Sequence, residues 1–458
     1  MIKRLLKRLS IANKSKKQGT ASNKANKKIT PTIIPKDIHG ISRRNISPSA
    51  LKVMNRLNQA GFEGYLVGGG VRDLLLEGSP KDFDVATDAT PEQVKTLFRN
   101  SRIIGRRFRI VHVRFGREII EVTTFRGQNS DSNQQVESDT GQLLRDNVYG
   151  DLESDALRRD FTANALYYSA KDLAIYDFTN GMEDIKNRQL KMIGDPATRY
   201  KEDPVRLLRA VRFAAKLGFS IEPNTQEPMR EQAHLLSHVP AARLFEEILK
   251  LFLNGYATAT YGLLRDYGLL EELFPESCRV MDNHPSYALL IDEMIINTDK
   301  RIRTDKRVTP AFVYAALLWP AMHNEFLKLT ADGASEVDAF TQASQKTTSL
   351  QLQRIMIPKR FLIPMRQIWE LQWRLPKRQG NRAPRLLEHP KFRAGYDFLL
   401  MREVAGEELD NLGSWWTQFQ HGSEELQATM LSELAPTPNT KKRRRKPKKK
   451  TATPTNDE

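Results

Sequence analysis

The pattern of hydrophobic and polar positions divides the chain into a mixed part and a helical part. Between residues 48 and 125, short apolar runs alternate with segments of helical periodicity, which indicates a mixed sheet of about five strands with covering helices. We expect a further helix from Leu157 to Tyr167, and almost only helical periodicity beyond Asp177. The predicted fold class is α+β: a mixed-sheet head, then an all-helical neck and body, with disordered basic termini.

Composition sets the boundaries of these parts. Residues 1–40 are rich in Lys, Asn, Ser and Thr and poor in aromatic residues, which is typical of a disordered extension. The polar segment 128–145 predicts a loop within the head. The other expected parts are the head at 41–190, the neck at 191–270, the body at 271–435 and a disordered tail at 436–458.

The net charge of +17 lies entirely at the two ends of the chain. Residues 1–40 carry a net charge of +10 and residues 441–458 carry +7, so residues 41–440 are neutral overall. Basic segments of this kind attract polyanions, and the distribution favours nucleic acid as a partner. The alternative is that the ends only aid solubility.

The chain has one cysteine, Cys278, and no stretch of about 20 apolar residues. A single thiol excludes an internal disulfide and fits a reducing compartment, so we expect a structural cysteine in a cytoplasmic protein. The first nine residues are basic and weakly amphipathic, but they lack the apolar core of a secretory signal. Weak attachment to the inner membrane surface through them stays open.

Two aspartates, Asp82 and Asp84, follow a glycine run at Gly68–Gly70. In an extended strand, residues two apart face the same way, so both carboxylates would share a face while Phe83 enters the core. Two oxygen ligands beside a loop of bare backbone suit Mg²⁺ that carries a nucleoside triphosphate. Isolated Asp-x-Asp pairs are also common on surfaces, and the glycines alone could form a tight turn.

The glycine run differs from the better-known phosphate loops. No glycine in the chain precedes a lysine, which excludes a Walker A motif, and no G-x-G-x-x-G segment opens a helix. Arg72, which follows the run and precedes Asp73, could neutralise phosphate charge or brace the loop through an acid.

Two further segments supply polar groups to the predicted site. Glu121 lies in an apolar, β-rich run, and a buried glutamate there needs a partner such as a metal ion or its water. Asp160 and Asn164 are four residues apart on the expected helix and would share a face. Arg159 would then clamp a phosphate beside them. The alternative is a solvated helix with an Arg–Asp pair.

The strongest helix signal begins at Glu202. We expect Asp203 as its N-cap, Pro204 in the first turn and Gly218 just after its last residue. Three arginines recur every three residues along it, namely Arg206, Arg209 and Arg212. This basic stripe could be an exposed charged face, or its guanidinium groups and the acids at the helix entrance could bind base edges.

A basic loop at 377–385 is flanked in the sequence by aromatic residues, namely Trp369, Trp373 and Tyr396. Basic side chains beside aromatic rings suit single-stranded RNA. The alternative is a solvated loop next to core aromatics. We expect Trp415 and Trp416 in the core.

As a set, these segments resemble the class II nucleotidyltransferases, the superfamily of bacterial poly(A) polymerases and CCA-adding enzymes. The resemblance rests on Leu66–Asp73, Lys81–Asp84, Glu121, Arg158–Asn164 and Glu202–Phe213. Other segments resemble the poly(A) polymerase branch in particular, namely 103–113, 240–247, 378–393 and the basic tail.

The resemblance implies template-independent transfer of AMP from ATP to RNA 3′ ends, with release of pyrophosphate. Asp82 and Asp84 would bind two Mg²⁺ ions, with Glu121 as a supporting carboxylate. Asp160 is the aspartate that the family treats as catalytic, although our interpretation of the residues favours nucleotide binding for it. The implied nucleotide-binding residues are Gly68, Gly69, Arg72, Asp73, Arg126, Arg159, Asn164, Glu202, Asp203, Arg206 and Arg209.

The implied partners are ATP and the 3′ ends of mRNA, small RNA and tRNA precursors, with RNA turnover as the expected purpose. An RNA chaperone or the degradation machinery is a further candidate partner. Two alternative functions stay open: a CCA-adding tRNA nucleotidyltransferase, and a catalytically inactive RNA-binding module on the same fold.

Overall fold

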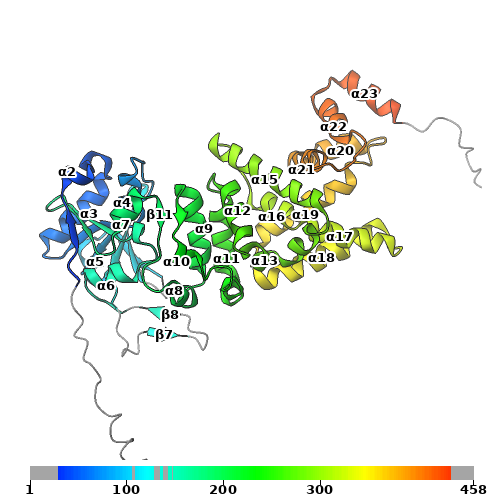
Figure 1. The fold of residues 1–458 in the computed structure, drawn as a ribbon. Helices are drawn as coiled ribbons and strands as arrows, with labels where there is room; N and C mark the ends of the chain where they lie inside the picture. Colours follow the sequence, from blue (N-terminus) through cyan, green and yellow to red (C-terminus); the bar gives the residue numbers. More distant parts are fainter. Residues whose placement is uncertain (1–28, 106–108, 128–134, 138–142, 147, 435–458) are drawn as a thin grey trace, which may run out of the picture. The chain divides into compact units, whose positions relative to one another are not determined.

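The computed structural model describes residues 29–105, 109–127, 135–137, 143–146 and 148–434 (Figure 1). The chain divides into two compact units. The head unit runs to Glu202 and includes Ser220–Thr225, whereas the helical unit comprises Asp203–Phe219 and the chain from Gln226 onward.

Within the described residues, eight strands form one mixed sheet in the head. Their order is β1-β10-β9-β2-β3-β6-β5-β4, and neighbouring strands are antiparallel except for the parallel pair β3 and β6. The strands are β1 (Thr32–Ile34), β2 (Gly64–Val67), β3 (Asp84–Thr87), β4 (Ser101–Ile104), β5 (Ile110–Phe115), β6 (Glu118–Thr124), β9 (Leu166–Ser169) and β10 (Ile175–Asp177). Two shorter strands of the head, β11 (Gln189–Leu190) and β12 (Ser220–Ile221), pair in parallel.

The sheet is larger than the local pattern predicts, because pairing between distant segments adds strands. Residues 29–40 were expected to be disordered, but β1 pairs with β10 and is followed by α2 (Lys36–His39). The prediction of disorder is therefore wrong for residues 29–40, and residues 1–28 lie outside the described residues. The tail at 436–458 lies outside them as well.

The helix predicted from Leu157 to Tyr167 is also wrong. The chain forms α6 (Leu152–Arg158), then a 3₁₀ turn at Thr162–Asn164, and then strand β9. All four residues of β9 are buried between β2 and β10. A strand that is buried on both faces shows no alternation of polar and apolar positions, so its apolar run resembles a helix segment.

The polar segment at 128–145 contains a short antiparallel pair rather than only a loop. Its strands are β7 (Gln135–Glu137) and β8 (Leu143–Asp146). The other residues between 128 and 142 lie outside the described residues.

Helices with clear start signals cover the sheet. In α3 (Pro48–Gln59), Ser47 caps the first turn, and Ala50, Val53, Met54 and Leu57 are buried at helical spacing. Thr90 and Gln93 form the capping box of α5 (Pro91–Leu97). The remaining helices of the head are α4 (Gly69–Leu75), α7 (Gly181–Lys186) and α8 (Pro196–Glu202).

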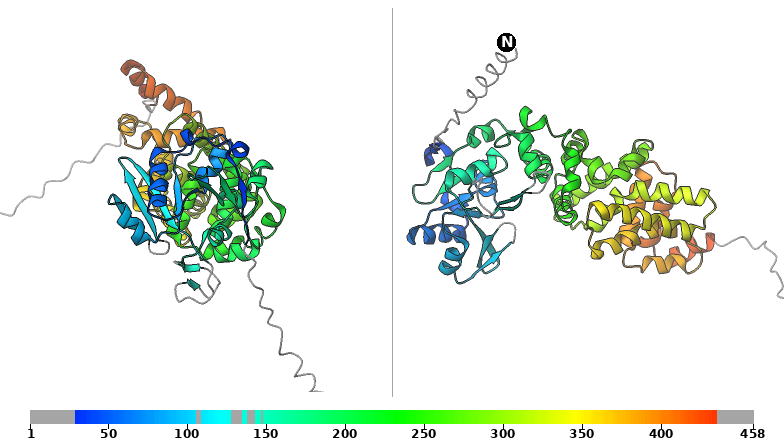
Figure 2. Two further views of the ribbon diagram at one scale, coloured as in Figure 1. Left: turned by 90° about the vertical axis from the view of Figure 1, so that its left-hand side faces the viewer. Right: turned by 90° about the horizontal axis from the view of Figure 1, so that it is seen from below.

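The described part of the helical unit consists of helices and their connections, as two further views show (Figure 2). None of the described helices is long and apolar enough to cross a membrane. The helices are α9 (Val205–Leu217), α11 (Ala241–Phe252), α12 (Ala257–Asp266), α13 (Leu269–Leu273), α14 (Pro275–Met281), α15 (Pro285–Arg303), α16 (Pro310–Leu317), α17 (Trp319–Ala331), α18 (Glu336–Arg354), α19 (Lys359–Arg374), α20 (Arg382–Leu387), α21 (Phe392–Val404), α22 (Leu412–His421) and α23 (Glu424–Glu433). The short α10 (Pro223–Gln226), of which all but the last residue belongs to the head, precedes a 3₁₀ segment of the helical unit at Ala233–His238.

Buried tryptophans anchor the core of the helical unit. The indole N–H of Trp369 donates to the carbonyl of Ala315, and that of Trp416 donates to the carbonyl of Leu375. Trp415 is partly buried against the same cluster as Trp416. Cys278 is buried and free, as expected of a structural cysteine.

Candidate active site

The parallel pair β3 and β6 brings together the acids that the sequence singled out. Asp84 is the first residue of β3, and it lies opposite Glu121 of β6 in the strand register. Asp82 is exposed and precedes the strand, so the expectation that both aspartates lie within one strand is wrong. That their carboxylates face the same way stays a prediction. Phe83 between them is buried, as predicted.

The neighbouring charged groups change the pKa of Asp84. Burial raises the pKa of Asp84, Glu121 and Asp82 raise it further by repulsion, and Arg159 partly opposes them, so that the pKa is about 6. A carboxylate with this pKa is destabilised in its charged form. A divalent cation beside it would remove the repulsion, which makes the cluster suited to a metal that arrives with substrate.

The donor set fits Mg²⁺ carried by a nucleotide better than a resident metal cage. In the part of the chain that is described, no group of three His, Cys, Asp or Glu side chains could hold a metal ion by itself. Mg²⁺ usually keeps several waters and binds through one or two carboxylates together with substrate phosphates. Asp82 and Asp84 supply carboxylates of that kind, so the residues fit the ion.

Glu121 is less buried than the sequence suggested. Its side chain is 46% exposed, and its Oε1 lies 3.1 Å from Nε2 of His112, the residue opposite it on β5. The expectation that Glu121 is buried is therefore wrong, and His112 already provides a polar partner for it. A place for Glu121 beside a metal ion stays a prediction.

The glycine run forms the turn between β2 and α4. Gly68 has a φ of 73°, which side chains other than glycine rarely adopt. A Cβ placed on Gly68 would lie 3.7 Å from Nη1 of Arg159 and 4.0 Å from Oδ2 of Asp84. The glycine therefore keeps the space between the arginine and the aspartate open to a ligand.

Arg72 braces this turn. It is only 2% exposed, and it donates to Oδ1 of Asp73 through Nε at 2.8 Å and to Oδ1 of Asn164 through Nη1 at 2.6 Å. Of the two roles left open for Arg72, these contacts support the brace. Asn164 in turn donates to Oδ1 of Asp160 at 3.1 Å. Asp160 and Asn164 do meet as predicted, although through a 3₁₀ turn instead of a helix.

Arg159 is held by two residues that the sequence did not single out. Its Nε and Nη2 donate to Oδ2 of Asp155 at 3.2 and 2.9 Å, and Nε also donates to the hydroxyl of Tyr167 at 2.8 Å. Burial would lower the pKa of Arg159, but Tyr167 and Asp155 reverse this and raise it above its usual value. The spacing of four residues between Asp155 and Arg159 was a signal that could have been used.

Arg126 lies near the same network. Its backbone N–H donates to Oδ1 of Asp155 at 3.1 Å, and its side chain reaches the carbonyl of Arg109 at 3.4 Å. Burial lowers its pKa, while Asp155 acts in the opposite direction. Arg126 is thus near the carboxylate of Asp155 that holds Arg159.

Glu202 belongs to the head unit. It accepts a hydrogen bond of 2.7 Å from Nη1 of Arg199, and Nη2 of Arg199 donates to the backbone carbonyls of Arg158 and Arg159. Arg199 thereby links Glu202 to the segment that carries Arg159. Sequence analysis missed Arg199, which no motif of the chain marks.

Asp203 belongs to the helical unit and does not cap α9. The cap position is Pro204, which makes no side-chain cap hydrogen bond. Asp203 instead accepts two hydrogen bonds from Arg243, at 2.6 and 2.8 Å. Gly218 does end α9 in a left-handed conformation, so that part of the prediction is confirmed.

The three arginines of α9 are partly buried. The guanidinium carbons of Arg209 and Arg212 lie 5.1 and 4.5 Å from the ring centre of Phe213. Nε of Arg212 is 3.7 Å from Oε2 of the buried Glu247. A stripe fully exposed to solvent, one of the two alternatives, is therefore excluded for these residues.

The basic loop near residue 377 combines cations with aromatic rings. Nζ of Lys377 lies 4.6 Å from the ring centre of Trp373, and the guanidinium of Arg378 lies 4.8 Å from that of Trp415. Arg382 and Arg385 are exposed. This arrangement offers charge and stacking surfaces on the helical unit.

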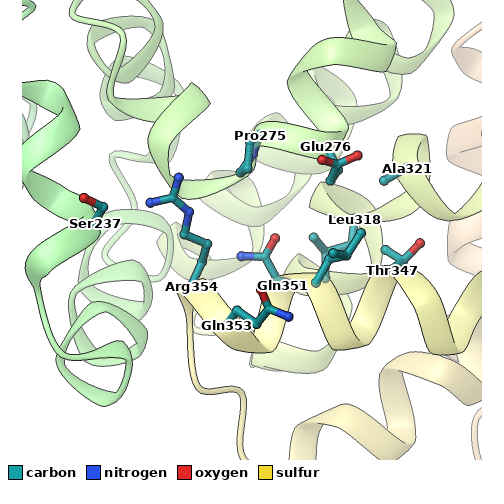
Figure 3. Close-up of a pocket in the computed structure, with 10 residues that line it drawn as sticks. Ser237, Pro275, Glu276, Leu318, Ala321, Thr347, Gln351, Gln353 and Arg354 are labelled. Atoms are coloured by element: carbon teal, nitrogen blue, oxygen red, sulfur yellow. The ribbon is translucent and has the colours of Figure 1, made fainter.

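A separate cavity of 380 Å³ lies within the helical unit (Figure 3). Gln351 and Arg354 of α18 line it together with Glu276 of α14 and Leu318. Gln351 donates to the carbonyl of Leu273, and Arg354 lies 3.7 Å from Glu272. None of the site residues named from the sequence lines this cavity.

A glycine turn, a carboxylate pair beside it and a third acid on the neighbouring parallel strand define the head as that of a nucleotidyltransferase. Family models agree over three stretches: "Poly A polymerase head domain" at residues 64–191, "Probable RNA and SrmB- binding site of polymerase A" at 218–281, and "Polymerase A arginine-rich C-terminus" at 332–450.

Comparison with curated proteins identifies the branch. The chain is 50% identical to Poly(A) polymerase I of Escherichia coli O6:H1 over 428 residues, and this match covers 92% of each chain. It is 38% identical to the CCA-adding enzyme of Lactobacillus helveticus, but over 226 residues, 49% of this chain and 54% of that enzyme. The chain therefore belongs to the poly(A) polymerase family.

The solved structures share the fold. A CCA-adding enzyme in its apo form II superposes with a TM-score of 0.59 at 17% identity, and the match covers 87% of this chain and 90% of that one. The predicted α+β class, with a mixed-sheet head followed by helices, is confirmed.

Proposed function

We propose that the chain extends RNA 3′ ends with AMP taken from ATP, without a template, and releases pyrophosphate. The observation that carries this proposal is the similarity to Poly(A) polymerase I over 92% of both chains. The similarity to a CCA-adding enzyme covers about half of the chain. The part of the chain that has no counterpart in this CCA-adding enzyme match is still similar to Poly(A) polymerase I.

In the proposed reaction, the terminal 3′ oxygen of the RNA forms a bond to the α-phosphorus of ATP. The bond from that phosphorus to the bridging oxygen breaks, pyrophosphate leaves, and the hydroxyl proton passes to solvent. Asp82 and Asp84 would hold two Mg²⁺ ions, which, when bound, activate the hydroxyl and neutralise the triphosphate. Glu121, opposite Asp84, would support this pair.

The glycine turn and Arg159 would receive the triphosphate. Gly68 and Gly69 let phosphate oxygens approach the backbone, and Nη1 of Arg159 lies beside Gly68 and Asp84. The chain of contacts from Asp73 through Arg72 and Asn164 to Asp160 would keep the turn in place. For Asp160 we favour this bracing role over direct catalysis. Arg126 would support Asp155 beside Arg159.

For the nucleobase we propose Asp203, Arg206 and Arg209 of the helical unit, and Glu202, their neighbour in the sequence. Carboxylate and guanidinium groups together can offer acceptors and donors to the edge of adenine. The bidentate pair of Asp203 with Arg243 fixes one of these acids in a defined orientation.

RNA would be bound by the basic loop near Trp373 and Trp415 and by the basic segments at the chain ends. The substrates that we propose are the 3′ ends of mRNA, small RNA and tRNA precursors in the cytoplasm. An RNA chaperone or the degradation machinery could deliver them.

An extension assay with each nucleotide tested separately would decide the function. Purified protein is incubated with Mg²⁺, a labelled RNA and one of ATP, CTP, GTP or UTP. We expect long tails with ATP alone, and no extension by the Asp84→Asn variant, which should still bind the RNA. Addition that needs CTP and stops after CCA would identify a CCA-adding enzyme. No incorporation with any nucleotide would support an inactive RNA-binding module.

A further inference from the structure

Tyr167, Asp155 and Arg159 form a closed network inside the head. The hydroxyl of Tyr167, which is fully buried on β9, donates to Oδ2 of Asp155 at 2.6 Å. The same Oδ2 accepts from Nε and Nη2 of Arg159, and Nε also donates to the hydroxyl oxygen of Tyr167. Two of the three nitrogens of the guanidinium group are thereby fixed on one side.

The third nitrogen of Arg159 lies on the side of the predicted triphosphate. A Cβ on Gly68 would be 3.7 Å from this Nη1 and 4.0 Å from Oδ2 of Asp84. Tyr167 pairs with Val67 in the ladder between β9 and β2. The tyrosine is thus fixed to the strand that leads into the glycine turn, so the arginine and the turn share one support.

We propose that Tyr167 and Asp155 are positioning residues for nucleotidyl transfer, which aim Nη1 of Arg159 at the triphosphate. The inference rests on the proposed function. Because the guanidinium group is planar and rigid, fixing Nε and Nη2 also fixes the direction of the Nη1 donors. A donor that is already in place needs no reorganisation when negative charge moves onto the leaving pyrophosphate.

Stability alone does not explain this network well. A buried ion pair is costly to desolvate, and apolar residues of similar volume often serve a fold equally well or better. Asp155 is 6% exposed and Tyr167 is 0% exposed, so both are buried beside Arg159. A role in orienting Arg159 gives a reason for placing a charged group there.

A matched pair of variants can separate positioning from packing. Tyr167→Phe removes the hydroxyl that contacts Arg159. Tyr168→Phe removes the hydroxyl of the next residue on β9, which is equally buried and has no hydrogen-bond partner among the described residues. We expect Tyr167→Phe to lower kcat/KM for ATP about tenfold and to leave the KM for RNA unchanged, and Tyr168→Phe to change neither.

A double-mutant cycle with Arg159→Ala tests whether Tyr167 acts through the arginine. If it does, Tyr167→Phe has little further effect once Arg159 is replaced. Full additivity of the two effects would overturn the proposal. So would equal losses of kcat/KM in Tyr167→Phe and Tyr168→Phe, because packing alone would then account for them.

ATP binding, measured by calorimetry with Mg²⁺, tests the positioning of Arg159 even if the protein transfers no AMP. If the wild-type protein transfers no AMP, the proposed function fails, but weaker ATP binding by Tyr167→Phe than by Tyr168→Phe would still support the positioning.

Should Tyr167→Phe not fold, Asp155→Asn takes its place. Its control is Asp184→Asn, because Asp184 is also a buried acid of the head, and its Oδ2 accepts from the hydroxyl of Thr162. Equal ATP affinity in variant and control would refute the proposal.

Discussion

Replacing Asp84 by asparagine should stabilise the metal-free head at neutral pH, although it removes a group that the reaction needs. Burial, Glu121 and Asp82 raise the pKa of Asp84 to about 6 from an ordinary value of 3.8. An acid whose pKa is higher in the folded state stabilises the fold below the unfolded pKa and loses that contribution as the pH rises through 6. Asparagine has the shape of the aspartate without its charge.

The size of the effect follows from the pKa. A difference of about two units corresponds to about 3 kcal/mol, since one unit is worth about 1.4 kcal/mol. Asp84 is partly exposed, so solvent screening should reduce this to about 2 kcal/mol. For a domain of this size, that shifts the melting temperature by roughly 6 °C. The gain should be present at pH 8 and vanish near pH 4.

Scanning calorimetry in EDTA at pH 8 and pH 4 measures this shift. The chain provides an internal reference, because its five tryptophans, at positions 319, 369, 373, 415 and 416, all lie in the helical unit. Tryptophan fluorescence therefore identifies the transition of the helical unit, which should not move. Asp82→Asn, which changes an exposed acid two positions away, should shift the head much less. A gain that is equal at both pH values, or a loss at pH 8, would refute the reasoning.

Three further predictions test the structural parts of the site. Gly68→Ala should raise the KM for ATP in the extension assay at least tenfold, because the residue has a φ of 73° and its Cβ would point between Arg159 and Asp84; an unchanged KM would exclude a ligand there. Arg72→Ala should destabilise the head by about 3 kcal/mol in urea unfolding, because it leaves buried polar partners unsatisfied; a cost below about 1 kcal/mol would contradict the brace. Deleting residues 441–458 should weaken RNA binding and flatten its dependence on salt, by about 0.7 in log–log slope per lost contact with a single strand; an unchanged slope would remove the tail from RNA binding.

Local pattern was sufficient for the parts of the head that are decided by nearby residues. The turn at Gly68 and the burial of Phe83 each depend on a few consecutive residues. The predictions failed where distant pairing decides. The strand β1 pairs with a segment more than 140 residues away, and β9 is stabilised by strands on both sides. The residues of each strand alone therefore do not predict that it is a strand.

The same division holds inside the site. Asp84 and Glu121 were found because their residue types suit a metal, but the register that sets them side by side exists only in the sheet. Tyr167 was overlooked because it was expected on a helix, where its hydroxyl would have had no defined partner. Once β9 is recognised as a strand next to β2, its position beside the glycine turn follows.

The contact between Arg72 and Asn164 explains why separate motifs act as one site. The glycine run and the Arg158–Asn164 segment are far apart in the chain, and each alone has an ordinary structural interpretation. A hydrogen bond of 2.6 Å between two buried side chains, 92 positions apart, joins them. Neither partner can be lost without leaving the other buried and unpaired at this contact. The two segments are therefore constrained together, which supports one function for both and favours the site over two independent structural turns.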